Sequence, residues 1–277
     1  GNSHDDQRVK NIRPHHIANR DVGVPLPRRH RRGHQFRQRG PHRHDRQADD
    51  RLAEAQQRRQ ANRPLHDPLR AQHQPGDQVE VEVDGYVVDI VRGDRLIEIQ
   101  TGNFSSIKRK MRALIPAYDL TLIYPVAAEK WLYKLPKPDW EEPRRRKSPK
   151  RGRVEEVFAE LVSFPELVSQ EGFHLQVALI QEEEVRRFTG EKMWWRNGWR
   201  RVERRLLDVV EEVDLSQPGQ LSSLLPPDLP GEFTTADLAR ELDCSRWLAQ
   251  KMAYCLRKLG EIESVGKQGR AWLYVRK

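Results

Sequence analysis

Hydrophobic and polar residues alternate along three consecutive segments, which read QVEVEV (78–83), YVVDIV (86–91) and RLIEIQ (95–100). Alternation with a period of two is typical of half-exposed strands. Asp84-Gly85 and Arg92-Gly93-Asp94 separate the segments and are signals for tight turns. The pattern therefore predicts a meander of three strands.

The pattern then changes between helical and extended periods. Apolar residues between Phe104 and Ile115 recur at helical spacing behind a possible cap, Asn103 or Ser105. Asn197-Gly198 suits a two-residue turn inside a Trp-rich hairpin (191–203). The other predicted elements are strands at 120–126, 131–135 and 174–180, helices at 154–162 and 204–215, and a Pro-rich connection at 221–231. The sum is a mixed α/β sheet unit.

The last 47 residues, 231–277, form a pattern of their own. Thr234 and Asp237 resemble a capping box, a second helix follows at 245–259, and two strands flank a glycine-containing tip. Helix, turn, helix and β-hairpin is the order of a winged helix. The expected core residues are Leu238, Leu242, Leu248, Met252, Leu256, Leu259, Ile262, Trp272 and Tyr274.

Charge is spread unevenly. The chain of 277 residues has a net charge of +9, yet residues 1–64 hold 16 Lys and Arg against 7 Asp and Glu, and the remainder holds 34 of each. Residues 1–64 also contain only 13 apolar residues, so they are predicted to be a disordered, basic, low-complexity segment. This segment could neutralise phosphates, or part of it could be translated out of frame, since the first Met is Met111.

Composition also excludes some classes of protein. Two cysteines, Cys244 and Cys255, cannot form a disulfide framework or a zinc site built mainly on thiolates. No apolar run is long enough to span a membrane, and no secretory signal is visible. The sequence therefore predicts a cytoplasmic protein without a membrane partner. Its expected divisions are the disordered segment 1–64, an α/β core (65–140), a basic loop (141–153), a middle α/β segment (154–230) and the winged helix (231–277).

Candidate chemistry lies in the predicted meander. Asp89 sits between Val88 and Ile90, and a carboxylate within an apolar strand is costly unless it is paired or binds a cation. If the register places Asp89 beside Glu98, two carboxylates meet, which suits Mg²⁺ or Mn²⁺. Such an ion activates water for phosphodiester hydrolysis. Glu82, Asp84 and Asp94 are alternatives to Asp89, although Asp84 and Asp94 fit turn positions better.

Asp89 followed by Glu98-Ile99-Gln100 on successive strands resembles the PD-(D/E)XK core of restriction-endonuclease-like nucleases. The resemblance covers about residues 65–135. It implies that Asp89 and Glu98 ligate the metal and that a lysine steadies charge near them. Gln100 stands where most members have that lysine, and Lys108 or Lys110 on the following helix could replace it. Glu54 or Asp67 could supply the acidic residue of a first helix.

Nucleic-acid contacts are predicted at two further places. Seven cations lie between Arg144 and Arg153, and six of them are the candidates Arg144, Arg145, Arg146, Lys147, Lys150 and Arg151. The winged helix would contribute Arg246, Gln250, Lys251, Lys267 and Arg270. Trp247 is expected to pack in the core or against a helix rather than to stack on bases. The acidic run Gln181 to Glu184 is expected to be a solvated strand end, with a second metal site as the alternative.

Two functions remain open at this point. One is a magnesium-dependent DNA endonuclease with winged-helix DNA binding, acting as a homodimer if it cuts both strands. The other is a non-catalytic winged-helix regulator or assembly protein with a degenerate nuclease fold. They differ in whether Asp89, Glu98 and a lysine meet at one place.

Overall fold

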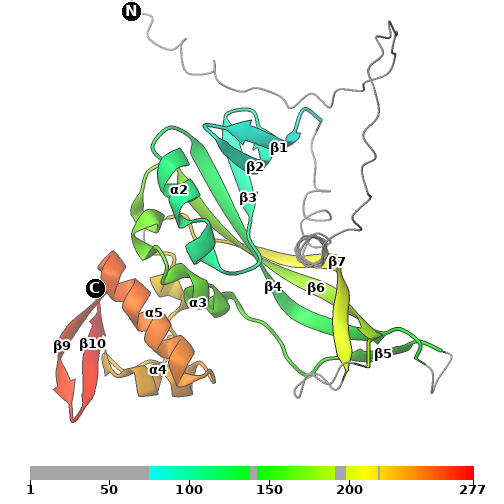
Figure 1. Ribbon diagram of the computed structural model, residues 1–277. Helices are drawn as coiled ribbons and strands as arrows, with labels where there is room; N and C mark the ends of the chain where they lie inside the picture. Colours follow the sequence, from blue (N-terminus) through cyan, green and yellow to red (C-terminus); the bar gives the residue numbers. More distant parts are fainter. Residues whose placement is uncertain (1–74, 138–141, 191–197, 218) are drawn as a thin grey trace, which may run out of the picture.

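The computed structural model describes residues 75–137, 142–190, 198–217 and 219–277 (Figure 1). The segment 1–64, the first-helix candidates Glu54 and Asp67, and Trp194 and Trp195 of the predicted hairpin lie outside the described residues. Within the described residues, no helix combines the length and the apolar character needed to cross a membrane.

A mixed sheet dominates the described part of the chain. Its order is β1-β2-β3-β4-β6-β7, with β5 paired to β4. The predicted meander is confirmed, since β2 is antiparallel to both β1 and β3. The sheet then turns parallel from β3 to β4 and from β4 to β6, before β7 returns antiparallel to β6. The strands are β1 (Gln78–Val83), β2 (Tyr86–Arg92), β3 (Arg95–Ile99), β4 (Asp119–Lys134), β5 (Arg144–Lys147), β6 (Phe173–Phe188) and β7 (Trp199–Asp214).

Residues 204–215 are not the predicted helix, because β7 runs through 199–214 and pairs with β6 along that length. Register shifts leave Leu207 and Val210 bulged outward, 43 % and 54 % exposed. Leu206 and Val209 therefore both face the sheet although they are three residues apart. Bulges thus produce an apolar spacing that imitates a helix.

One prediction of two strands and one prediction of a loop also need correction. The segments 120–126 and 131–135 form one strand, β4, which contains Pro125. Pro125 lies beyond the last β3 pair, Ile99 with Ile123, so its missing N–H interrupts no β3 pair. The basic segment at 144–147 is exposed, as expected, but it is strand β5 rather than a loop.

Helices cover one face of the sheet (Figure 1). Helix α2 (Lys108–Leu114) buries Met111 and Leu114, and helix α3 (Val157–Leu161) buries Phe158 and Leu161. Phe104 is fully buried between them, stacked on Phe164. Short 3-10 turns complete this layer: η1 (Phe104–Ser106), η2 (Val154–Glu156) and η3 (Pro165–Ser169). The opposite face carries a smaller buried cluster of Ile90, Ile97, Ile99, Ala178 and Ile180.

Strands β4, β6 and β7 continue well past the helical layer, and β5 joins them at the far end (Figure 1). We call this extension the arm and define it as residues 127–134, 144–147, 181–188 and 199–206. One sheet therefore connects the segments 65–140 and 154–230.

The C-terminal unit has the predicted element order. It contains β8 (Glu232–Phe233), α4 (Thr235–Glu241), α5 (Arg246–Leu259), β9 (Ile262–Gln268) and β10 (Ala271–Arg276), with sheet order β8-β10-β9. The capping box of Thr234 and Asp237 is present, and Gly260 ends α5 with a positive φ of 76°. The expected core residues are buried or partly buried except Trp272, which is 52 % exposed.

The C-terminal unit is joined to the helical layer of the sheet. One continuous hydrophobic core includes Phe158 and Leu167 on one side and Met252 and Leu256 on the other. The guanidinium of Arg153 donates a hydrogen bond to the carbonyl oxygen of Leu242. The turn η4 (Ser222–Leu224) is held by a 2.6 Å bond from the Ser222 amide to Glu261. These contacts fix the position of α5 relative to α3.

The capping box yields a stability prediction. Thr234 is 4 % exposed and its hydroxyl accepts hydrogen bonds from the amides of Ala236 and Asp237. We expect Thr234→Ala to lower the free energy of unfolding by about 1–2 kcal/mol, because two amides lose their acceptor. Urea denaturation followed by circular dichroism measures the change. The control Thr235→Ala keeps the cap, and an equal loss in both variants would contradict this role.

Candidate functional site

Asp89, Glu98 and Lys110 meet at the junction of β2, β3 and α2. Ile90 pairs with Ile97, so the next positions along the two strands are Asp89 and Glu98. There the amide of Ile99 donates a 2.8 Å hydrogen bond to Oδ2 of Asp89, a side-chain acceptor. The two carboxylates are close enough for the charge of Asp89 to raise the pKa of Glu98, so the predicted proximity is present.

Glu98 is 6 % exposed and shares a sheet face with Leu96, beneath the helical layer. Burial raises the pKa of its carboxyl group above the ordinary 4.5, and the neighbouring charge of Asp89 raises it further. The ammonium of Lys110 opposes both effects by donating a hydrogen bond to Oε2. Glu98 is thus a buried acid held between one like charge and one opposite charge.

The packing of α2 on the sheet places Lys110 at this position. Met111 and Leu114 are fully buried and anchor the helix on the sheet. Lys110 precedes Met111, and its side chain bridges the carboxylate of Glu98 and the carbonyl oxygen of Val87, which is 2.6 Å away. The ammonium therefore joins the helix to both β2 and β3.

Two other sequence candidates have different partners. The side-chain amide of Gln100 donates to the carbonyl oxygen of Gly102, and the ammonium of Lys108 donates to the carbonyl oxygen of Ser163 at 2.6 Å. Of the five predicted catalytic residues, the structure brings together Asp89, Glu98 and Lys110.

The chemistry of the donor set decides whether a metal fits. Mg²⁺ binds through one or two carboxylates and completes its shell with water and substrate phosphate. Asp89 and Glu98 provide such a pair, and a dication would relieve the repulsion that raises the pKa of Glu98. The described residues contain no group of three or more His, Cys, Asp or Glu that could hold a metal by themselves. Among the described residues, the pair therefore does not form an all-protein cage for a metal ion.

The alternatives to Asp89 have other settings. Asp94 is exposed in the turn between β2 and β3. Asp84 has a positive φ of 49° in the first turn and accepts a 3.1 Å hydrogen bond from the hydroxyl of Tyr118. Asp84 and Asp94 thus occupy the turns expected of them.

The acidic run at 182–184 is not a solvated strand end. It lies within β6, and all three glutamates are buried. Nη2 of Arg204 lies 2.5 Å from Oε2 of Glu182. The ammonium of Lys130 lies 2.6 Å from Oε1 of the same carboxylate, where it forms an ion pair without hydrogen-bond geometry. Arg186 and Lys130 contact Glu184, while Arg145 and Arg205 contact Glu183. Cations from β4, β5, β6 and β7 therefore neutralise these carboxylates.

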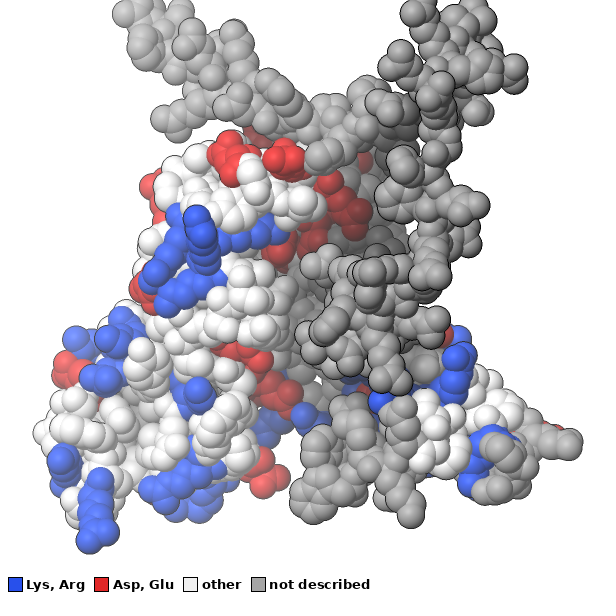
Figure 2. All heavy atoms as spheres, in the orientation of Figure 1, with Lys and Arg blue, Asp and Glu red and all other residues white. Residues whose placement is uncertain are grey.

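A second candidate surface is a groove of about 350 Å³ between α5 and the β9–β10 hairpin. Arg246, Gln250 and Arg270, three of the predicted contacts, line it, and Arg257 is a further cation of the lining that sequence analysis missed. Arg246, Gln250 and Arg257 are spaced to lie on one face of α5, which was the available signal. The groove lining includes no Asp or Glu. Figure 2 shows Lys and Arg atoms gathered on this C-terminal unit.

Aromatic rings near this groove are exposed and each lies under a lysine. Trp247 is 56 % exposed beneath Lys251, Trp272 lies 4.6 Å from the ammonium of Lys267, and Tyr254 is paired with Lys258. The expectation that Trp247 packs in the core is therefore wrong. Cations hold these rings at the surface of the unit.

The remaining predicted cations belong to β5 and the residues after it. Arg145 and Lys147 lie over the ring of Trp131, and Lys147 and Arg151 contact Glu129. Lys150 lies 3.8 Å from Glu156. Of the Trp-rich hairpin, Trp199 is packed against Phe188 and is 8 % exposed, as expected for a packing role.

Residues 63–216 match the family described as Domain of unknown function (DUF8091). The chain belongs to this family. The DUF8091 region contains Asp89, Glu98, Lys110 and the arm, and the C-terminal unit follows it. The chain is also 29 % identical over 221 residues to an uncharacterized protein of Treponema pallidum (strain Nichols), a match that covers 76 % of this chain and 83 % of that protein. No solved structure matches.

The buried pair predicts a pH-dependent loss of stability. We expect Lys110→Met to lower the free energy of unfolding by about 3 kcal/mol at neutral pH, because Glu98 loses its countercharge. Because the pKa of Glu98 is raised in the folded state, the ionised carboxylate lowers the free energy of unfolding at pH values above that pKa. This destabilisation disappears as the carboxyl group is protonated. The loss should therefore shrink as pH falls through the raised pKa of Glu98 toward the ordinary value of 4.5. Denaturation curves across this range measure it.

Lys108→Met is the matched control, because Lys108 lies on the same helix and contacts a carbonyl oxygen rather than a carboxylate. Its effect should not depend on pH in this range. Parallel pH profiles for the two variants would contradict the assignment of Lys110 to Glu98.

Proposed function

We propose that this protein is a metal-dependent phosphodiesterase that hydrolyses DNA, with a C-terminal winged-helix unit that binds the substrate. The observation that supports hydrolysis is the meeting of Asp89, Glu98 and Lys110 at one place. They follow one another as strand carboxylate, turn, strand carboxylate and helix lysine, which is the order seen in the nuclease resemblance.

In this proposal, Asp89 and Glu98 would hold a divalent cation, which supplies charge stabilisation and lowers the pKa of a bound water. The carboxylate of Asp89 is held in position by the hydrogen bond from the amide of Ile99. Lys110 carries the positive charge of the site and would contact a phosphate oxygen of the substrate. Gln100 would have an indirect role, because its side-chain amide donates a hydrogen bond to the carbonyl oxygen of Gly102 and so holds the turn after β3.

A non-catalytic function is the second candidate, and one observation favours it. Glu98 is buried and already paired with Lys110, so the site is electrostatically satisfied without an ion. In that case the sheet would serve as a scaffold for the C-terminal unit. Metal binding and cleavage separate the two candidates directly.

The C-terminal unit supports nucleic-acid binding by its arrangement. Helix α5 would occupy the position of a recognition helix, and the β9–β10 hairpin that of a wing. The groove between them presents Arg246, Arg257 and Arg270 without an acidic residue in its lining. Phosphate recognition by such cations fixes a protein on a duplex.

Cleavage of plasmid DNA tests the proposed hydrolysis. We expect the wild type to nick the plasmid with Mg²⁺ or Mn²⁺, and Asp89→Asn and Glu98→Gln to reduce the rate by at least about 100-fold, because each removes a ligand charge. Isothermal titration of Mn²⁺ should show weakened binding in the same variants. The assay should include single-stranded and duplex DNA.

Asp94→Asn is the matched control, since it removes an equivalent charge from the adjacent turn. It should leave cleavage unchanged. Wild type that binds no metal and cuts no DNA would instead support the non-catalytic function.

The groove on the C-terminal unit is tested by DNA affinity. We expect Arg246→Gln combined with Arg270→Gln to weaken duplex binding about tenfold, and to lower the slope of log K against log salt by about 2, because two phosphate contacts are lost. Arg240→Gln combined with Lys277→Gln removes the same charge from positions outside the groove lining. Equal losses in the two double variants would argue against the groove.

A further inference from the structure

Helix α5 carries two aromatic rings on its outer face. Its inner face buries Met252, Cys255 and Leu256, whereas Trp247 is 56 % exposed and Tyr254 is 40 % exposed. The two rings are seven residues apart and therefore lie on the same side of the helix. Exposed apolar side chains that gather on one face, unlike scattered ones, mark a surface that binds a partner. The rings therefore indicate a ligand that lies along α5.

A lysine accompanies each ring. The ammonium of Lys251 lies 5.2 Å from the centre of the Trp247 ring, and that of Lys258 lies 6.0 Å from the centre of the Tyr254 ring. Each lysine follows its ring by four residues, which is one turn further along the same face. We call Trp247, Lys251, Tyr254 and Lys258 the α5 stripe. Rings alternating with cations are suited to a ligand that combines aromatic bases with phosphates.

The stripe borders a hollow of about 340 Å³ between α5 and the end of α3. This volume lies within the range of small-ligand sites, about 300–1,000 Å³. Gln250 and Tyr254 line both the hollow and the α5 groove, so the two adjoin along the helix. Among the described residues, neither lining includes Asp or Glu. The lining of the hollow is Val162, Trp247, Gln250, Lys251 and Tyr254.

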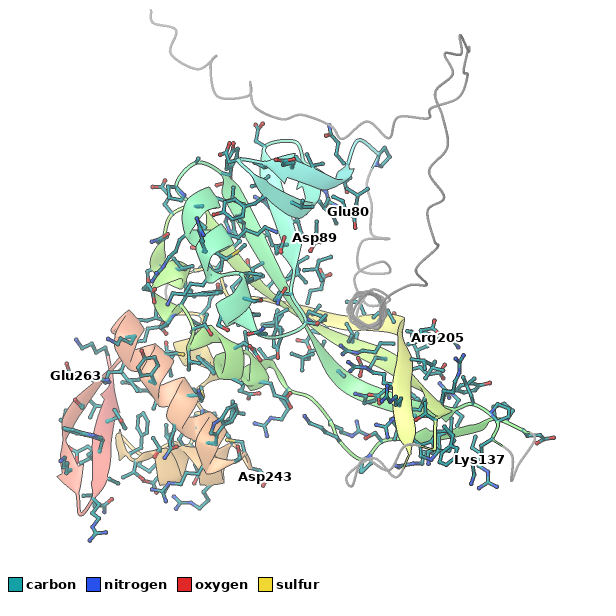
Figure 3. The ribbon with its side chains drawn as sticks, viewed as in Figure 1. Glu80, Asp89, Lys137, Arg205, Asp243 and Glu263 are labelled. Carbon is teal, nitrogen blue, oxygen red and sulfur yellow. The ribbon has the colours of Figure 1, made fainter. Side chains whose placement is uncertain are left out.

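Charge along α5 has one sign. The helix, RWLAQKMAYCLRKL, contains four Lys and Arg and no Asp or Glu. Figure 3 shows Asp243 and Glu263, two carboxylates of the C-terminal unit, beyond the two ends of the helix. An anionic ligand can therefore follow α5 without meeting a like charge on it.

The rings favour an unpaired strand over a duplex. Within a duplex, neighbouring bases cover the faces of each base, whereas unpaired bases can stack on aromatic side chains. Trp247 and Tyr254 are about 10.5 Å apart along the helix axis, at ~1.5 Å per residue. This distance is about three times the ~3.4 Å between successive nucleotides of a duplex strand. The two rings therefore match an extended strand whose bases are no longer stacked on each other.

We infer that the α5 stripe binds a segment of single-stranded DNA. The two rings receive unpaired bases, and the two ammonium groups contact the adjoining phosphates. This inference rests on the proposed DNA binding by the C-terminal unit and specifies the form of the substrate. The groove holds duplex backbone, and the stripe beside it holds a strand that has left the duplex. The preferred substrate is then a junction between duplex and single-stranded DNA.

Two oligonucleotides of equal length, about 16 nucleotides, test this inference. One is oligothymidylate, and the other is abasic, so that it keeps the phosphates without the bases. The full chain is titrated in EDTA against each labelled oligonucleotide, and fluorescence anisotropy gives the affinity. Three double variants are compared with the wild type: Trp247→Ala with Tyr254→Ala, Trp247→Phe with Tyr254→Phe, and Leu207→Ala with Val210→Ala.

We expect the alanine pair in the stripe to weaken binding of oligothymidylate at least about tenfold, because base stacking on the rings is lost. Its affinity for the abasic oligonucleotide should change little, since both lysines remain. The phenylalanine pair keeps aromatic faces and should retain most of the affinity. Leu207 and Val210 are exposed apolar residues of β7 and serve as the matched control, which should bind like the wild type. Circular dichroism checks that each variant is folded.

Equal losses for oligothymidylate and the abasic oligonucleotide would overturn the inference, because the rings would then not contact bases. Unchanged binding of oligothymidylate by the alanine pair would also overturn it and would assign the stripe to a protein partner. A loss of the same size in the control pair at 207 and 210 would show that any exposed apolar residue has this effect.

Duplex binding separates this inference from the proposed function. If Arg246→Gln with Arg270→Gln loses duplex affinity while the alanine pair binds oligothymidylate like the wild type, the groove stands and the stripe fails. If the alanine pair shows the expected loss while the groove variant binds duplex normally, only the groove assignment fails. A protein that cuts no DNA but shows the expected loss contradicts only the proposed hydrolysis.

Discussion

The parallel pairing of β4 with β6 is the constraint on which the rest of the structure depends. It runs from Leu120 with Phe173 to Lys134 with Arg186, and so joins the first half of the chain to the second. In its first part, the helical layer covers it and it supports β3, where Glu98 lies. In its second part, β5 and β7 flank it and it becomes the arm. One strand pair thus sets the position of both the carboxylate site and the arm.

The local parts of this fold could be predicted from sequence. The meander, the helix after it and the C-terminal unit depend on contacts between neighbouring segments, and their turns and caps are visible in residues such as Gly85, Thr234 and Gly260. The meeting of Asp89 with Glu98 follows from one hairpin register. Lys110 was predictable as a candidate but not as the chosen lysine, because the rotation of α2 depends on how Met111 packs on the sheet.

Features that depend on distant pairing were not predictable. Residues 204–215 have helical apolar spacing, and only the register shifts against β6 explain that spacing as bulged strand. Glu182, Glu183 and Glu184 look solvated in the sequence, because their partners lie elsewhere in it, at Lys130, Arg145 and Arg204. Likewise, the seven cations after Pro143 look like one uniform run, whereas strand geometry divides β5 into two faces with different partners.

The contact between Lys110 and Glu98 means that the chain supplies its own countercharge to a buried carboxylate inside the sheet. A buried carboxylate that depended on a dissolved ion would tie the folding of β3 to the concentration of that ion in the surroundings. Here the ammonium arrives with α2 as part of the same polypeptide, so the countercharge of Glu98 is put in place by folding itself.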